Sequence, residues 1–259
     1  VSFVPNPVRT GYGSWVWPNG ILHLLRHCIE HESFDYFQLM SPSCLPIRPI
    51  GEFAEYIANS RVDAHIEFMD LLERDVMMTF GHRVFAPDNT LRRSMLRHAR
   101  TWYFGTDSLL TSRAGLSVLS RRDEGERPLR AKLGYALTRM WGRSPFAVKA
   151  PSSRSHVLIG GPWFGATREV CEYLLRTANE PQWLKYFRCV NDIGELVFAT
   201  ILGNSAYRLG PFNHYVSPYR DWHPRWLTND DIGLLAESQR FFGRKFVDDP
   251  DSEVRRLVL

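Results

Sequence analysis

Glu195 is the acidic residue best placed to act as a base. It directly precedes the apolar segment 196–202, and with Asp192 it has the Asp-x-x-Glu spacing of a capping box that opens a helix. On these residues alone, a helix cap is the favoured interpretation. The alternative is that a carboxylate at the head of a buried helix projects into a cleft and takes a proton from a substrate.

Two cations near the carboxyl end could stabilise a negatively charged group. Arg225 follows His-Pro, and Lys245 lies in the segment Phe-Phe-Gly-Arg-Lys-Phe. The residues between them predict an amphipathic helix over 229–243, so the two side chains can meet only if packing brings the flanking loops together. Two separate surface cations are the simpler interpretation.

Two further segments could line a ligand site. One is the Ser/Pro-rich turn that starts at Ser41, after an expected strand, where ligands often bind at the edge of an α/β sheet. The other is Gly-Gly-Pro-Trp-Phe, in which the glycines allow close backbone approach and Trp163 offers a flat apolar face. Taken alone, the first segment is better explained as a plain strand-to-helix turn.

The sequence does not predict a metal site. It contains no HExxH motif, and its Asp-x-Asp, Asp249-Pro-Asp251, stands in a polar segment that reads as a solvated turn. It also lacks GxSxG, a P-loop and GxGxxG, which leaves no signature of a serine hydrolase or of these nucleotide-binding motifs.

The elements that must position these residues alternate between strands and helices, which predicts an α/β domain. We expect one domain over 1–259, with a loop-rich insertion over 104–155 on the acceptor side. Apolar periodicity predicts helices over 21–29 (capped by Asn19), 50–59, 89–100, 167–177, 192–202 and 229–243, and strands over 35–40 and 156–160.

Composition is that of a soluble globular protein, with 44% hydrophobic and 23% charged residues. The net charge of +4 suits an anionic partner or a phosphate-bearing substrate. Nucleic-acid binding through the basic loops 92–100 and 121–132 is a rival interpretation, but no nucleic-acid motif accompanies them. No apolar run reaches the length of a membrane span.

Several segments, taken in order, resemble the core-2/I-branching β-1,6-N-acetylglucosaminyltransferase family, which includes peptide xylosyltransferases and plant-type relatives. The segments are YFQLMSPSCLPIRP, GGPWFGATREVCEYLL, NDIGELVFATILGNS and HPRWLTNDD followed by FFGRKF. The resemblance implies a GT-A-type fold with a mixed central sheet. It also implies an inverting reaction without a bound metal or other cofactor, in which a UDP-sugar donates GlcNAc or xylose to a hydroxyl of a glycan or protein.

The resemblance also implies residue roles. Glu195 would be the catalytic base, and Arg225 and Lys245 would face the donor diphosphate. Ser41, Trp163 and Phe164 would contribute to the substrate pocket. Such an enzyme would be cytoplasmic or membrane-peripheral in a bacterium and would lie in the Golgi lumen of a eukaryote.

The sequence departs from the family pattern in three places. Cys44 stands where many relatives have Asp, and the Pro of the family's Pro-Asp-Glu block is missing before Glu195. The family's first strands have no counterpart before Val1, so we expect the amino-terminal part of the fold to be missing. A non-catalytic glycan- or nucleotide-binding descendant of the family is therefore the alternative.

Overall fold

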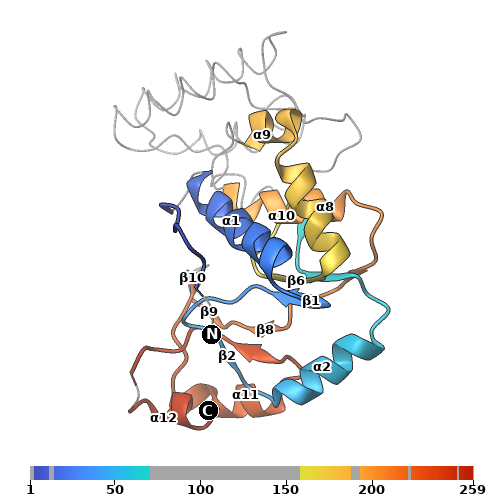
Figure 1. The fold of residues 1–259 in the computed structure, drawn as a ribbon. Coiled ribbons are helices and arrows are strands. Elements are labelled where there is room, and N and C mark those ends of the chain that lie inside the picture. Colours follow the sequence, from blue (N-terminus) through green and yellow to red (C-terminus); the bar gives the residue numbers. More distant parts are fainter. Residues whose placement is uncertain are drawn as a thin grey trace, which may run out of the picture. The chain divides into compact units, whose positions relative to one another are not determined.

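The computed structural model describes residues 3–11, 15–70, 158–187, 193–220, 223–249 and 251–258 (Figure 1). The expected helix over 89–100, the expected insertion over 104–155, the basic loops 92–100 and 121–132, and Asp192 lie outside these ranges. The chain divides into two compact units. Unit 1 comprises 1–33, 68–162 and 171–206, and unit 2 comprises 34–67, 163–170 and 207–259.

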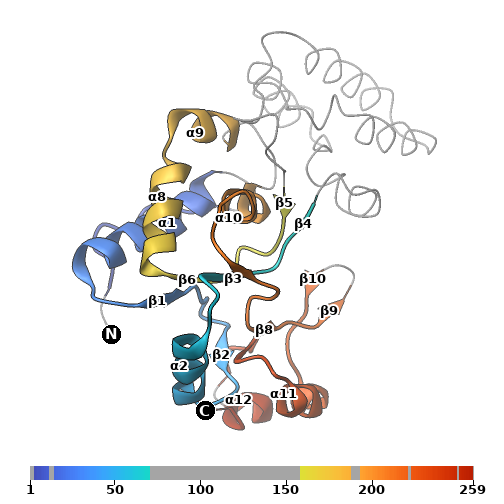
Figure 2. The ribbon, with the colours of Figure 1, turned by 90° about the vertical axis from the view of Figure 1, so that its right-hand side faces the viewer.

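Unit 1 is mainly helical in its described part (Figures 1 and 2). Its elements are α1 (Val16–His31), β4 (Met69–Asp70), β5 (Leu158–Ile159), most of α8 (Arg168–Ala178), α9 (Pro181–Phe187), the 3-10 helix η1 (Ile193–Glu195) and α10 (Val197–Gly203). The strands β4 and β5 pair antiparallel.

In unit 1, α10 is a buried helix fixed to β5. Residues 197–202 are all buried. The Thr200 hydroxyl accepts a hydrogen bond from the Leu158 amide and donates one to the Leu158 carbonyl, both at 3.1 Å. These bonds satisfy a polar group that would otherwise be costly to bury. The residues just before α10 are thus attached to a fixed helix.

Unit 2 contains most of the strands that the structure describes. Its elements are β1 (Tyr36–Gln38), β2 (Leu45–Pro46), α2 (Ile50–Asn59), β3 (Ala64–Ile66), β6 (Phe164–Thr167), β7 (Leu209–Gly210), β8 (Tyr215–Val216), β9 (Tyr219–Arg220), β10 (His223–Pro224), the 3-10 helix η2 (Asn229–Asp231), α11 (Ile232–Glu237), β11 (Phe242–Gly243) and α12 (Glu253–Arg256).

A four-stranded sheet of mixed orientation has the order β1-β6-β3-β7. β6 is antiparallel to β1 and β3, whereas β3 is parallel to β7. Gly165 in β6 lies opposite Gln38 on one side and His65 on the other. A Cβ at Gly165 would collide with the Gln38 side-chain oxygen and the Tyr36 hydroxyl, so glycine lets these polar side chains cross the sheet face.

A three-stranded mixed sheet has the order β2-β11-β8, with β11 antiparallel to β2 and parallel to β8. An aromatic core formed by Phe53, Tyr215, Phe241 and Phe242 packs with Cys44. A second cluster joins α11 and α12 to this sheet through Leu227, Leu235, Phe246 and Val254. The mixed α/β class is therefore as predicted.

The described elements confirm most of the expected helices and strands. α2 has the predicted bounds, and β1, β5 and α8 lie within or nearly within the predicted ranges. The predicted cap of the first helix is wrong, because α1 starts at Val16 and the Asn19 amide already donates to the Trp15 carbonyl inside the helix.

The helix predicted over 229–243 is also wrong in its second half. η2 and α11 cover 229–237, and β11 follows at Phe242–Gly243. Phe241 and Phe242 are buried in the aromatic core, and the Phe241 and Phe242 amides both donate to the His214 carbonyl. Packing and pairing in the sheet therefore override the helical pattern of these residues.

Candidate functional site

Glu195 is the last residue of η1 and stands two residues before α10, in unit 1. It is half-buried, and the Gly160 amide donates to its carbonyl at 2.9 Å. This bond joins the Gly-Gly-Pro-Trp-Phe segment to the Glu195 segment, two of the blocks that the sequence singled out. The capping box itself is untested, because Asp192 lies outside the described residues.

The chain around Glu195 is closely packed against α1. A Cβ at Gly194 would come within 2.9 Å of the Trp17 ring, so a larger residue there would displace the ring or the backbone. Trp17, Gly194 and the buried helix α10 together hold the Glu195 backbone in place. A positioned base needs such a fixed backbone.

Arg225 and Lys245 are brought together in unit 2 by backbone pairing. The Lys245 amide donates to the Arg225 carbonyl at 3.5 Å, and the Leu227 amide donates to the Lys245 carbonyl at 2.8 Å. The sequence left open whether these two loops meet. In the structure their backbones lie side by side.

The Arg225 side chain forms an ion pair that the sequence analysis missed. Its two terminal nitrogens donate to the two oxygens of Asp231, at 2.7 and 2.5 Å. Asp231 is buried, and its carboxylate also accepts the Thr228 amide at 2.8 Å in a capping box. Hydrogen bonding from Arg225 lowers the pKa of Asp231 and keeps it ionised. The Thr-x-x-Asp spacing from Thr228 was the signal available in the sequence.

Lys245 is half-buried and lies beside an exposed indole. Its Nζ is 5.6 Å from the centre of the Trp226 ring, and Trp226 is 52% exposed. A cation over an aromatic face is stabilised by the ring quadrupole. The described part of unit 2 thus presents a positive charge and a flat apolar surface together.

Ser41 and Trp163 both lie near the segment 244–246, which follows β11. The Ser41 hydroxyl is within 3.0 Å of the Ser43 hydroxyl, and the Ser43 carbonyl accepts the Phe246 amide at 2.9 Å. The Arg244 guanidinium lies 4.1 Å over the Trp163 ring. The segment 244–246, which contains the predicted cation Lys245, therefore contacts Trp163 directly and reaches Ser41 through Ser43.

Phe164 belongs to the core of the described part of unit 2. Its ring is fully buried and lies 5.8 Å from the ring of Phe37 in the core of the four-stranded sheet. A contribution of Phe164 to the substrate pocket stays a prediction, and in the described structure its side chain has no exposed surface.

Glu195 belongs to unit 1, and Arg225 and Lys245 belong to unit 2. The roles that the resemblance implies require the three side chains to converge on one donor site, and this convergence stays a prediction.

A buried pair of histidines in unit 2 was not recognised from the sequence. The rings of His65 and His214 are 4.2 Å apart and both side chains are fully buried. His65 Nδ1 is 2.8 Å from the Tyr36 hydroxyl, whereas His65 Nε2 and both nitrogens of His214 have no hydrogen-bond partner among the described residues. Burial lowers the pKa of His65 to about 4 and that of His214 to about 3, the latter also through His65 and Arg240.

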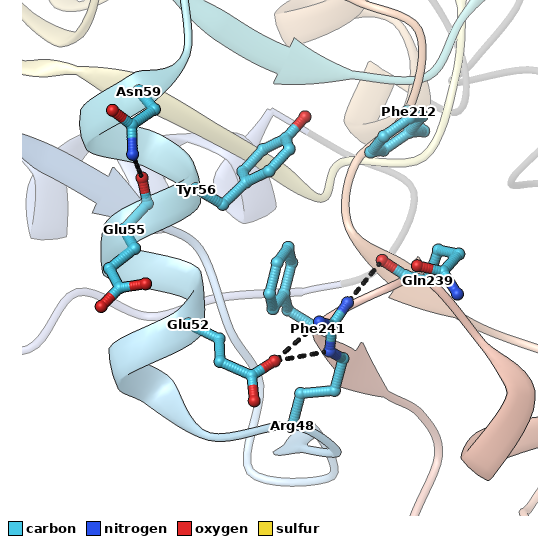
Figure 3. Close-up of a pocket in the computed structure, with 8 residues that line it drawn as sticks. All are labelled: Arg48, Glu52, Glu55, Tyr56, Asn59, Phe212, Gln239 and Phe241. Atoms are coloured by element: carbon cyan, nitrogen blue, oxygen red, sulfur yellow. Dashed lines mark hydrogen bonds and ion pairs between the residues drawn. The ribbon is translucent and has the colours of Figure 1, made fainter.

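An open cavity of about 520 Å³ lies beside this pair (Figure 3). We call it the α2 cavity, because α2 forms one wall and Arg48, Phe212, Gln239 and Phe241 complete the lining. Its lining contains none of the site residues predicted from the sequence. Because its aromatic residues are far apart in the chain, no local sequence motif indicates the cavity.

Three histidines on α1 have a spacing that is found in metal sites and that the sequence analysis did not consider. His23, His27 and His31 recur at four-residue spacing, which places imidazoles on one helix face as in many metal sites. The rings of His27 and His31 are 4.6 Å apart. Within the described ranges, however, no group of three or more His, Cys, Asp or Glu side chains is arranged to hold a metal ion.

In the part of the chain that the structure describes, no helix combines the length and apolar character needed to cross a membrane. In comparisons with known proteins, no family model and no curated protein matches this chain. The family resemblance in the motifs is therefore the basis of a proposal.

Proposed function

We propose that the chain is an inverting glycosyltransferase of GT-A type that moves GlcNAc or xylose from a UDP-sugar to a hydroxyl of a glycan or protein acceptor. No metal takes part in the proposed reaction. The observation that carries the proposal is the backbone pairing of Arg225 with Lys245, because it joins the two cation blocks that the family resemblance assigns to the donor diphosphate.

The proposed reaction is a single displacement. The Glu195 carboxylate takes the proton of the acceptor hydroxyl while that oxygen forms a bond to the anomeric carbon of the donor sugar. The bond from this carbon to the diphosphate oxygen breaks on the opposite face, and UDP leaves with the electron pair. Configuration at the anomeric carbon is inverted.

Lys245 is the cation that suits the leaving diphosphate best. Its charge is attached to a backbone that is bonded on both sides, to Arg225 and Leu227. A fixed cation stabilises negative charge that develops in the transition state without reorganising. The Arg225 fork is already bonded to Asp231, so Arg225 acts by holding the 225–231 turn and by adding positive charge nearby.

The test is a UDP-release assay with UDP-GlcNAc and UDP-xylose, comparing the wild-type chain with Glu195→Gln. We expect the variant to lose about 2 to 4 decades of rate, the usual contribution of a positioned base. UDP binding should hardly change. Glu30→Gln, on the exposed surface of α1, is the matched control and should keep the wild-type rate. A Glu195→Gln variant that transfers sugar normally would show that Glu195 is only structural.

Metal independence is tested in the same assay with excess chelator. Activity should persist, because fixed cations replace the divalent ion. Activity that disappears in chelator and returns with manganese would contradict this part of the proposal.

One observation favours a second candidate, a glycan- or nucleotide-binding protein without turnover. Both terminal nitrogens of Arg225 are bonded to Asp231, which withdraws the guanidinium from the negative charge that would develop on a leaving diphosphate and so disfavours turnover more than it disfavours binding. UDP binding measured without any UDP release from either donor would support this candidate.

A further inference from the structure

The α2 cavity is a site that the proposed transfer reaction does not use. Glu195, Arg225 and Lys245 are not among the residues that line it. Its volume of about 520 Å³ is within the range of small-molecule sites, and it is lined by both apolar and polar side chains.

Aromatic rings form the apolar part of the cavity. Figure 3 shows the rings of Tyr56, Phe212 and Phe241 grouped on the same side of α2. Tyr56 is 37% exposed, so part of its ring is available to a ligand. Such faces suit ligands that have a flat surface of C–H groups.

The cavity is held in shape by contacts within unit 2. The Phe241 ring packs against the rings of Phe53 and Tyr56, at 5.1 and 5.4 Å. Arg48 donates twice to Glu52, at 3.0 and 2.6 Å, and its guanidinium lies 4.7 Å over Phe241. A wall that is already fixed loses less entropy when a ligand binds.

Charge in the cavity is nearly balanced. Arg48 and Glu52 neutralise one another, and Glu55 leaves a single uncompensated carboxylate. Neither a polyanion nor a strongly cationic ligand is favoured by this lining. Among the described residues, the Tyr56 hydroxyl, the Gln239 amide and the Glu55 carboxylate make no hydrogen bond to protein, so they are available to hydroxyl groups of a ligand.

We propose that the α2 cavity binds a neutral sugar, with a pyranose face on Tyr56 and its hydroxyls on the polar groups of Gln239 and Glu55. A pyranose combines an apolar C–H face with a rim of hydroxyl donors and acceptors, which matches an aromatic surface edged by amide and carboxylate groups. This proposal does not depend on the transfer reaction, because sugar binding in the α2 cavity is expected whether or not the chain transfers sugar.

The experiment titrates the full chain with N,N′-diacetylchitobiose, cellobiose and xylobiose, using saturation-transfer NMR and calorimetry. We expect at least one of them to bind with a Kd of about 1 mM, as for a small, open site. Tyr56→Ala should weaken binding about five- to tenfold, whereas Tyr56→Phe should keep most of it because the ring remains. Ile50→Ala, at a 54% exposed position on the same helix, should bind as wild type.

Gln239→Ala provides a second variant if Tyr56→Ala does not fold, and it should weaken binding about two- to fivefold through the lost amide. The proposal is overturned if none of the three sugars binds at about 20 mM. It is equally overturned if a sugar binds but neither cavity variant weakens that binding. Glu195→Gln should bind these sugars as wild type, so failure of this site and failure of the transfer proposal are distinguishable.

Discussion

Unit 2 buries two polar clusters whose hydrogen bonding differs. In the first, Asp231 is held by Arg225 and Thr228, and each carboxylate oxygen has a donor. In the second, the His65 and His214 rings pack at a tilt of 51° among aromatic rings, and three of their four ring nitrogens have no hydrogen-bond partner among the described residues. The first cluster requires a charge, whereas the second requires neutrality.

The difference indicates how each cluster stabilises the unit. The carboxylate of Asp231 is favoured by a bidentate cation and by a backbone amide, so removing its charge leaves Arg225 without its partner. The histidines contribute aromatic packing, with Phe53 and Phe212 rings at 5.4 and 5.1 Å from His214. Protonating either histidine would place an unpaired charge in an apolar site.

The largest effect on stability is expected from Asp231→Asn. This change leaves the Arg225 cation without its carboxylate and weakens the capping box at Thr228. Breaking a buried ion pair costs about 3–5 kcal/mol, and because the Arg225 side chain is 34% exposed we expect the lower end, about 3 kcal/mol. Urea unfolding measures the loss.

Asp230→Asn is the matched control, because it alters the exposed neighbour in the same turn. It should change the free energy of unfolding by less than about 0.5 kcal/mol. Equal losses in the two variants would contradict a specific role of the Asp231 ion pair and would remove the contrast between the clusters.

The two clusters should lose their contributions to stability in different pH ranges as the pH is lowered. The pKa of each histidine is lowered by folding from about 6.5, so the unfolded chain binds more protons and stability falls as the pH drops below about 6.5. Between pH 7 and pH 5.5, each histidine should lower the free energy of unfolding by about 1 kcal/mol. The pKa of Asp231 is also lowered, so its contribution is present above about pH 4 and is lost only below that.

Urea unfolding at a series of pH values from 7 to 5 measures this dependence. His214→Asn should remove about half of the histidine contribution, because asparagine does not titrate and tolerates the left-handed backbone at this position, where φ is 68°. A variant with the same pH dependence as wild type would show that the His65–His214 pair does not set it.

Local patterns in the sequence predicted much of the fold. Apolar periodicity located α2 and α8, because their spacing reflects one buried face. It failed at Phe241 and Phe242, where apolar residues belong to a sheet and to an aromatic core that forms between distant segments. Such packing depends on tertiary structure, which a single sequence does not display.

The candidate site was predictable only in part. Spacing identified Glu195 as a helix cap or a base, and the family resemblance assigned a role to Lys245. From the residues alone two separate surface cations were favoured, whereas the structure joins the Arg225 and Lys245 loops by a backbone bond. The Arg225–Asp231 pair has a local signal in Thr228-x-x-Asp231, whereas the α2 cavity has none. Its walls come from residues 48–59, 212 and 239–241, which only folding brings together.

The smallest loss of stability is expected from Arg225→Lys. This variant tests whether Arg225 acts through its ion pair with Asp231 or by contacting the UDP-sugar donor. Lysine keeps the charge but cannot reproduce the two parallel bonds of the guanidinium to the Asp231 carboxylate. The urea midpoint should therefore fall by less than in Asp231→Asn. In the double variant the two losses should not add, because both changes remove one shared interaction.

The same variant also has a functional outcome. If Arg225 acts by holding the turn, Arg225→Lys should alter UDP binding only as far as it alters stability, whereas Lys245→Ala should lower UDP binding and turnover together. A variant of Arg225 that is as stable as wild type but binds UDP much more weakly would instead assign the guanidinium to the donor. In that case Asp231 would orient a residue that binds the donor. The Arg225–Asp231 cluster would then serve binding as well as stability, whereas the His65–His214 pair contributes packing.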